Sequence, residues 1–317
     1  MDRVPPTTSL SLGAPGGSRL AFVAAWGQWA TAAQGVTVTV SGDKALAGFL
    51  LTLLSAGGSS HSAVAGTVAN VTLPRDGSVT VTVQGVDEAG NVDPVGATAA
   101  VFVDSAAPVT EWVTPPPLLS NSTTVTASVG ASGERAGAIA AFTASLACVS
   151  GCAAVGATPR TVTVNASGDG TAALALDSVG SGVYNLTVFA EDVVGSSNPG
   201  GAWFVTIVDT EPPRCGFASP AALMTNRSVV DIGVWTADAL DSVVVWAAVS
   251  GGGVATVAPA GDSVSVWTPA QGHYTVTLQC VDSAGNSAMP PAPSLTLTVS
   301  APPHWTNVSL WGVCVGD

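Results

Sequence analysis

Three stretches of the chain alternate between apolar and polar side chains. In the third, residues 274–281, the Tyr, Val, Leu and Cys at the even positions would point to one side of an extended chain. An alternation with a period of two is typical of a half-buried antiparallel strand. Residues 79–85 and 184–190 repeat the pattern, so the sequence predicts one such strand in each stretch.

These stretches belong to an internal repeat with fixed spacing. Each copy has a Gly ten residues before an Asp and another Gly three residues after it, as in Gly77, Asp87 and Gly90. A second marker, Val-Asp followed by Pro, comes after each copy. It lies at 103–108 and 208–213, without its Asp at 299–303, and in a related form at 2–6. Recurrence at this spacing indicates tandem structural units.

The repeat divides the chain into three units and the start of a fourth. We expect unit 1 at 1–104, unit 2 at 105–209, unit 3 at 210–300 and the start of a further repeat at 301–317. Met1 falls inside a linker, so we expect the chain to be a piece of a longer array. The segment 20–34 in unit 1 fits no part of the repeat and has no assigned role.

Each unit has the pattern of a β-sandwich. Further β-rich runs lie at 36–40, 123–129, 203–208, 229–235, 242–249 and 295–299. Helical periodicity is weak, and the chain contains 36 Gly and 21 Pro. Short strands with frequent turn signals over about 100 residues predict an all-β fold of antiparallel sandwiches with seven strands each.

The repeat motif also resembles a known family. Tyr-x-[Val/Leu]-x-[Val/Leu]-x-[Ala/Cys]-x-Asp-x-x-Gly, from Tyr184 and from Tyr274, is similar to the F strand and F–G turn of fibronectin type III and bacterial Ig-like repeats. The Asp-x-Ala-Gly-Asn turns and the linkers favour the bacterial Ig-like type. The resemblance implies Ig-like domains of a large extracellular protein, with both tyrosines as tyrosine-corner residues. Unit 1 departs from it with Val79 in place of Tyr, and unit 2 with Ser196 in place of Asn.

Composition excludes several classes of function. Charged residues are only 9% of the chain, the net charge is −13, and Lys44 is its single lysine, so there is no basic patch for nucleic acid. The longest apolar candidate for a membrane span, 20–40, is interrupted by Gly and Gln and ends as a strand pattern. Residues 20–25 are too short for a signal-peptide core.

Asparagine is concentrated in N-glycosylation sequons. Six Asn precede x-Ser or x-Thr: Asn70, Asn121, Asn165, Asn185, Asn226 and Asn307. The excess predicts a secreted glycoprotein. The alternative is that Asn and Thr merely suit strand ends and turns.

The five cysteines suggest disulfides. The repeat places Cys280 on the inward side of its strand and Cys215 on the first strand of the same unit, so we expect them to be joined. Cys148 and Cys152 could close a small loop, for which zinc is a rival. Cys314 is left over, and we expect its partner to lie outside this chain. Reduced core thiols remain the alternative for all of them.

No motif of an active site is present. The three histidines are isolated, and there is no nucleophile elbow, phosphate loop or zinc-protease motif. The recurrent Asp residues suit turns, in which they would accept bonds from the backbone. The sharper alternative is Ca²⁺ at the domain junctions. Its candidate ligands are Asp87, Glu88, Asn91, Asp93 and Asp104 for one junction, and Glu191, Asp192 and Asp209 for the next; unit 3 has Asp282 but Ser300 in place of the linker acid.

These observations favour a non-catalytic extracellular repeat protein, a spacer or adhesive stalk whose first partners are other repeats of the same longer chain. A second hypothesis is a module that binds carbohydrate or a cell-surface protein, supported by Trp235, Trp246 and Trp267 in unit 3, although core packing is expected for most of them. A third is an accessory region of a secreted enzyme whose catalytic domain lies outside this chain.

Overall fold

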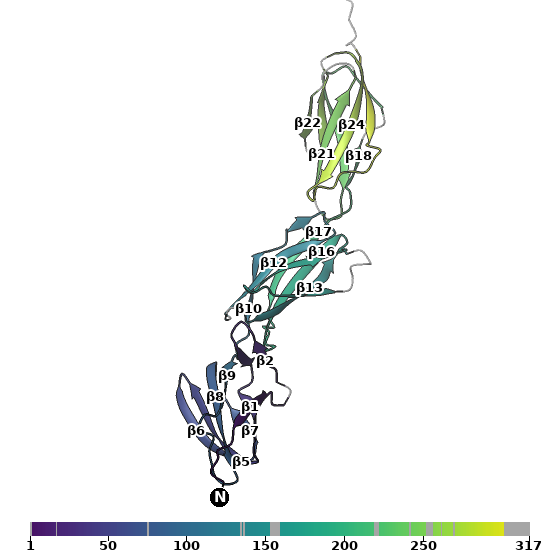
Figure 1. Cartoon of the computed structure of the whole chain (residues 1–317). Coiled ribbons are helices and arrows are strands. Elements are labelled where there is room, and N and C mark those ends of the chain that lie inside the picture. Colours follow the sequence, from purple (N-terminus) through teal and green to yellow (C-terminus); the bar gives the residue numbers. More distant parts are fainter. Residues whose placement is uncertain are drawn as a thin grey trace, which may run out of the picture.

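The computed structural model describes residues 2–16, 18–74, 76–133, 135, 137–152, 159–218, 222–240, 242–251, 256–260, 262–268 and 270–300. In these residues the chain forms strands β1 to β25 and no helix (Figure 1). The start of a fourth repeat at 301–317, with Asn307 and Cys314, lies outside the described residues.

No helix in the described part of the chain is long and apolar enough to cross a membrane.

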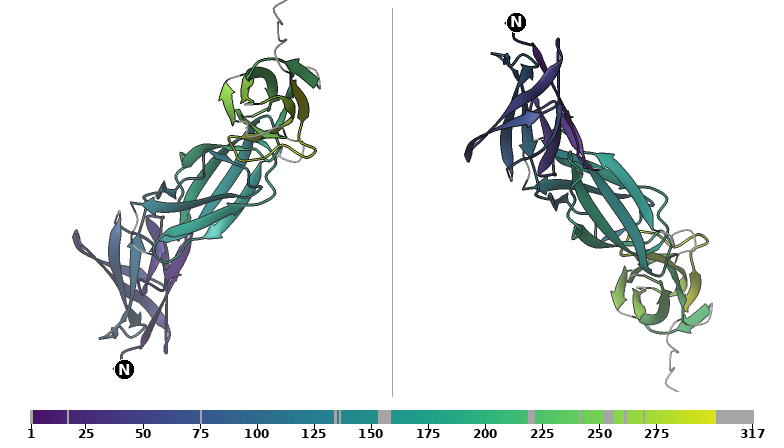
Figure 2. Two further views of the ribbon diagram at one scale, coloured as in Figure 1. Left: turned by 90° about the horizontal axis from the view of Figure 1, so that it is seen from above. Right: turned by 90° about the horizontal axis from the view of Figure 1, so that it is seen from below.

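The strands form three sandwiches that follow one another along a line (Figures 1 and 2). Every strand pair in the described residues joins strands of the same unit, within 8–103, 109–208 or 214–299. Each sandwich has one sheet that contains the first strand of the unit and a facing sheet that contains the strand with the repeat motif. This is the two-sheet arrangement of an Ig-like domain.

Unit 1 packs a three-stranded sheet, β1-β4-β7, against a six-stranded sheet, β2-β3-β9-β8-β5-β6. The strands are β1 Thr8–Gly13, β2 Leu20–Val23, β3 Gln28–Thr31, β4 Gly35–Gly42, β5 Leu46–Ser55, β6 Gly58–Ala65, β7 Val68–Thr72, β8 Gly77–Asp87 and β9 Ala97–Val103.

Unit 2 pairs the sheet β10-β12-β15 with the sheet β11-β17-β16-β13-β14. The strands are β10 Val109–Thr114, β11 Leu119–Ser120, β12 Val125–Ser132, β13 Ile139–Ser150, β14 Arg160–Asn165, β15 Thr171–Leu176, β16 Gly182–Asp192 and β17 Ala202–Val208.

Unit 3 has the sheets β18-β20-β23-β22 and β19-β25-β24-β21. The strands are β18 Arg214–Phe217, β19 Ala222–Thr225, β20 Val229–Ala237, β21 Val243–Ser250, β22 Thr256–Ala260, β23 Ser263–Trp267, β24 Gly272–Asp282 and β25 Ser294–Val299.

The alternating stretches lie at the centre of each core. They form β8, β16 and β24, whose inward side chains are buried between the sheets. Tyr184 and Tyr274 are fully buried, and each hydroxyl donates to a backbone carbonyl four residues upstream, that of Gly180 or Ala270, at 2.8 Å. Both are tyrosine corners, which fix the entry of the strand.

Several strands were not predicted from the sequence, and in each unit one of them is short and parallel to its neighbour. The short strands β3, β11 and β19 each run parallel to the last strand of their unit, β9, β17 or β25. The unassigned segment 20–34 supplies this strand in unit 1: β2 and β3 form an antiparallel hairpin. The units therefore have more than the seven strands expected from the sequence.

Candidate functional site

Each recurrent Asp turn lies at the end of its unit where the preceding linker enters, so the turns of units 2 and 3 are at the junctions between units. Oδ1 of Asp87 accepts bonds from the backbone N–H groups of Ala89 and Asn91, at 3.0 and 2.8 Å. Asp192 and Asp282 form equivalent bonds to the residue four positions on, at 2.8 and 2.7 Å. The Gly of each turn has a positive φ, between 84° and 94°, which residues with a side chain rarely adopt.

Each turn faces the linker that precedes its own unit. The side-chain amide of Asn91 donates to the carbonyl of Asp2 at 3.2 Å, and that of Asn286 donates to the carbonyl of Asp209 at 2.8 Å. In the middle, Asp104 is the linker acid that interacts electrostatically with Asp192.

This arrangement corrects the ligand groups proposed from the sequence. Asp87 and Asp104 do not share a junction, because β8 ends at the turn and β9 carries the chain back along the unit before the next linker begins. Asp192 and Asp209 are separated in the same way by β17. Glu88 and Asp93 stay with Asp87 at the start of unit 1.

Three carboxylates meet at the junction of units 2 and 3. Oxygen atoms of Asp209, Asp238 and Asp282 lie within 4.8 Å of one another, and Asp209 and Asp282 are buried. Sequence analysis missed Asp238, which lies between β20 and β21 and belongs to no repeated motif. Three oxygen ligands in one place are suited to a hard cation such as Ca²⁺.

The equivalent places in the other units are different. In unit 1 the ammonium group of Lys44 donates to Oδ2 of Asp2 and to the carbonyl of Val4, both at 2.7 Å. A protein side chain therefore supplies the positive charge there. In unit 2 Oδ2 of Asp192 is fully buried and has no hydrogen-bond partner among the described residues. In units 1 and 3 the Asn of the turn donates to this oxygen, but unit 2 has Ser196 at that position.

These contacts lower the pKa of some Asp carboxyl groups and raise that of another. The amide of Asn91 holds the pKa of Asp87 below its usual value. The Lys44 ammonium lowers the pKa of Asp2. Hydrogen bonds from the Thr8 side chain and from backbone groups lower the pKa of Asp93 to about 2. Burial, by contrast, raises the pKa of Asp192.

The four cysteines in the described residues form two disulfides. Cys215 is bonded to Cys280, with a Cα–Cα distance of 6.5 Å, and Cys148 is bonded to Cys152. Zinc is therefore not needed to explain the second pair. In units 1 and 2 the place of the Cys215–Cys280 bond is taken by a hydrogen bond. The Thr8 hydroxyl accepts from the N–H of Gly85, and Thr110 accepts from Ala190, both at 2.9 Å.

Four of the five sequons in the described residues are exposed on the surface of the sandwiches. Asn70, Asn121, Asn165 and Asn226 are exposed. Asn185 points outward from the central strand β16 but is only partly exposed, and its Oδ1 is inaccessible to solvent. The amide of Asn185 is therefore less accessible for glycosylation than the amides of the four exposed sequons.

The three tryptophans of unit 3 do not form one platform. Trp235, Trp246 and Trp267 are each nearly half exposed, which differs from the core packing expected for most of them. Trp246 is on β21 of one sheet. Trp235 and Trp267 are both on the other sheet. Trp235 is near the end of β20, whereas Trp267 pairs with Val229 at the start of β20, so the two rings are far apart along the sheet.

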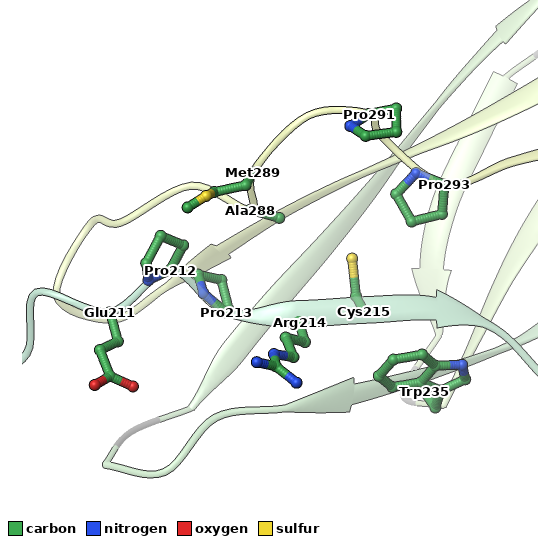
Figure 3. Close-up of a pocket in the computed structure, with 10 residues that line it drawn as sticks. All are labelled: Glu211, Pro212, Pro213, Arg214, Cys215, Trp235, Ala288, Met289, Pro291 and Pro293. Atoms are coloured by element: carbon green, nitrogen blue, oxygen red, sulfur yellow. The ribbon is translucent and has the colours of Figure 1, made fainter.

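A pocket of about 520 Å³ lies beside Trp235 (Figure 3). The start of β18 forms its floor, with Pro213, and the loop carrying Met289 and Pro291 covers it. Cys215 points toward this loop. The lining is mainly proline and apolar, with Arg214 and Glu211 at its edge, and it holds no nucleophile paired with a base.

The described histidines bond to neighbouring strands. Nδ1 of His61 contacts the Thr52 hydroxyl at 2.9 Å, and Nδ1 of His273 contacts that of Thr298 at 3.0 Å. His304 lies outside the described residues. These bonds are cross-strand contacts of a sheet surface.

No family model and no curated protein sequence matches the chain. It is similar in structure to the native E. coli alpha-2-macroglobulin, with 11% identity and a TM-score of 0.27, over 94% of this chain and 23% of that one. It is also similar to the FN1–FN3 domains of chicken CNTN1, with 12% identity and a TM-score of 0.29 over 93% and 98% of the two chains. A third similar structure is that of invasin, a bacterial integrin-binding protein. It has 12% sequence identity and a TM-score of 0.35, over 93% of this chain and 60% of invasin.

The chain thus spans less than a quarter of the alpha-2-macroglobulin and about three fifths of invasin. The strand order of the three units carries the assignment of the fold: the chain is a tandem array of Ig-like β-sandwiches.

Proposed function

We propose that this chain is part of a non-catalytic extracellular repeat protein that acts as a structural spacer or adhesive stalk. The observation that carries the proposal is the way each linker is fixed to the units. The backbone N–H of Asp104 donates to the carbonyl of Thr31, and that of Asp209 donates to Ser120, so the linker starts bound to the unit behind it. Asn286 of unit 3 then donates to the carbonyl of Asp209, so the second linker is also bound to the unit that follows it.

An extracellular setting has two supports. Disulfides persist in oxidising compartments and are rare in the cytosol. The four exposed sequons are accessible to a glycosyltransferase without any change in the fold. A low content of charged residues also leaves the surface dependent on other polar groups, which attached sugar would supply.

The chain, secreted from a eukaryotic host, is expected to be an elongated glycoprotein. Small-angle scattering should give a radius of gyration well above the roughly 20 Å of a compact globule of this length. Treatment with an N-glycosidase should reduce its mass, with glycopeptides at Asn121 and Asn165 and none at Asn185. A radius near the compact value would contradict the spacer role, and an unchanged mass would contradict the glycoprotein.

Calcium at the junctions remains a prediction, now narrowed to Asp209, Asp238 and Asp282. Millimolar Ca²⁺, the range of extracellular sites, is expected to raise the melting temperature of unit 3 relative to EDTA. Asp238→Asn should abolish the response, because it removes one of the three carboxylates. Asp231→Asn removes an exposed carboxylate on β20 of the same unit; it is the matched control and should keep the response. An equal melting temperature with Ca²⁺ and EDTA would end the calcium hypothesis.

The alternative of a binding module is favoured by one observation, the pocket beside Trp235. An exposed aromatic ring next to a concave surface is a common feature of ligand sites. The separation of the three tryptophans weighs against a long sugar-stacking face, so the spacer remains our first proposal.

A further inference from the structure

The connection between the first strand and the parallel strand is much longer in unit 1 than in its neighbours. It spans 14–27 in unit 1, but only 115–118 in unit 2 and 218–221 in unit 3. The added residues form β2 and the turn that joins it to β3. This β2–β3 hairpin lies at the end of unit 1 that meets unit 2 (Figure 1).

The hairpin covers the Asp turn of unit 2. Val23 and Ala30 from the hairpin and Val194 from the turn are buried in one apolar cluster, against which Trp26 and Val193 pack. This cluster is separate from the three sandwich cores. It therefore exists only while the two units touch.

The covered turn has a matching sequence. Between its Asp and its Gly, unit 2 has Val193-Val194, whereas unit 1 has Glu88-Ala89 and unit 3 has Ser283-Ala284. Val194 is buried, and its counterpart Ala89 is exposed. The hairpin in unit 1 and the valines in unit 2 are thus two departures from the repeat that fit each other.

Polar contacts surround this apolar cluster. The guanidinium of Arg135, from unit 2, lies over the ring of Trp26 at 4.8 Å and over that of Phe102 at 5.5 Å. Such cation–π contacts are favourable even at exposed sites. Arg19 forms an ion pair with Glu191 at 3.2 Å, but both side chains are about half exposed, so this pair contributes little.

The junction of units 2 and 3 has no counterpart to the hairpin in the described residues. An open cleft of about 440 Å³ lies there, lined by Gly151 and Asp209 of unit 2 and by Asp238 and Leu240 of unit 3. The contact from Asn286 to the linker is a polar hydrogen bond, whereas the first junction buries a set of apolar side chains.

We propose that the β2–β3 hairpin is a brace that docks onto the Asp-Val-Val-Gly turn of the following sandwich and holds units 1 and 2 as one rigid body. Bending of the chain is then concentrated at the junction of units 2 and 3. The hairpin also selects its neighbour, because only a turn with apolar residues between Asp and Gly completes the cluster. This inference does not depend on the spacer role.

The test measures distance distributions across both junctions in the full chain. Spin labels on unnatural amino acids at the exposed positions Ser62, Thr163 and Thr275 report units 1, 2 and 3 without disturbing the disulfides. With EDTA present, so that no Ca²⁺ ties Asp209 to unit 3, electron–electron double resonance should give a narrow distribution for 62–163 and a broader one for 163–275.

The decisive variant is Val193→Ser with Val194→Ala. It gives unit 2 the Asp-Ser-Ala-Gly turn that unit 3 already uses, so the sandwich should fold. The 62–163 distribution should become at least as broad as the 163–275 distribution, which should not change. Trp203→Ala removes an exposed tryptophan elsewhere on unit 2 and should leave both distributions unaltered.

Two results would overturn the brace. One is equal widths across the two junctions of the unchanged chain. The other is a 62–163 distribution that stays narrow in the Val193→Ser, Val194→Ala variant, with a native circular dichroism spectrum. A compact particle in the scattering experiment would contradict the spacer role but would leave this result standing.

Discussion

Replacing both Cys215 and Cys280 with Ala is expected to lower the melting temperature of unit 3 by about 15–30 °C and to leave units 1 and 2 unchanged. The bond joins residues 65 positions apart. In the chain-entropy model, closing a loop of this length stabilises the folded state by about 4 kcal/mol. For a domain of about 100 residues, each kcal/mol corresponds to about 4–8 °C. Calorimetry of the full chain measures all three transitions together.

The repeat supplies a matched variant for the same position. Cys215→Thr with Cys280→Ala recreates the Thr110–Ala190 pair of unit 2, in which the hydroxyl accepts a backbone N–H at 2.9 Å. It should melt above the double Ala variant, because a buried hydrogen bond contributes about 1 kcal/mol. Removing the Cys148–Cys152 bond is the control and should affect unit 2 alone. A drop of only a few degrees in unit 3 would contradict the prediction.

The same substitution at two equivalent turns is expected to have opposite effects. At neutral pH, Asp87→Asn should lower the melting temperature of unit 1, because Oδ2 of Asp87 accepts from the amide of Asn91 at 2.9 Å. An amide at this place would oppose that donor. Asp192→Asn should raise the melting temperature of unit 2, because Oδ2 of Asp192 is a buried charge without a partner among the described residues.

Both effects should vanish in acid. The folded pKa of Asp87 is lowered, so its contribution to stability exists above the unfolded value of 3.8 and is lost as the pH falls through the folded pKa. The folded pKa of Asp192 is raised, so its penalty exists at neutral pH and is relieved as the pH falls toward 3.8. Melting curves of the two variants and the unchanged chain, from neutral pH to a pH well below 3.8, measure this. If both variants changed the melting temperature in the same direction, the prediction would be wrong, and Ser196 in place of Asn would not explain the difference between the two turns.

The sequence predicted the features that recur at fixed spacing. Alternation places the inward side chains of β8, β16 and β24 correctly, because a strand buried on one face has a period of two. Alignment of the copies also paired Cys215 with Cys280, since both replace residues that face each other in the other units. Pattern and repetition are local properties, and the sequence shows them directly.

The missed features depend on contacts between distant segments. Strands β11 and β19 have only two and four residues, too few to show a period. The hairpin at 20–31 seemed foreign to the repeat because only Leu20 and Trp29 pack against its own sandwich, whereas Val23 and Ala30 are buried against unit 2. Asp238 is distant from Asp209 and Asp282 in sequence, and only the fold brings the three carboxylates together. Each linker acid lies near the Asp turn of the unit that follows it, because the last strand of its own unit carries the chain away from that unit's turn.

The parallel pairing of β3, β11 and β19 with the last strand of each unit has a mechanical consequence. Tension along the array pulls the first part of a unit toward one end and the last strand toward the other. Two parallel neighbours are then drawn past each other along their length, so their evenly spaced hydrogen bonds are loaded together instead of opening one at a time. The longest of these pairs in the described residues, β19 with β25, belongs to the unit whose first strand is also bound covalently to its centre, so under force unit 3 would be the last to extend fully.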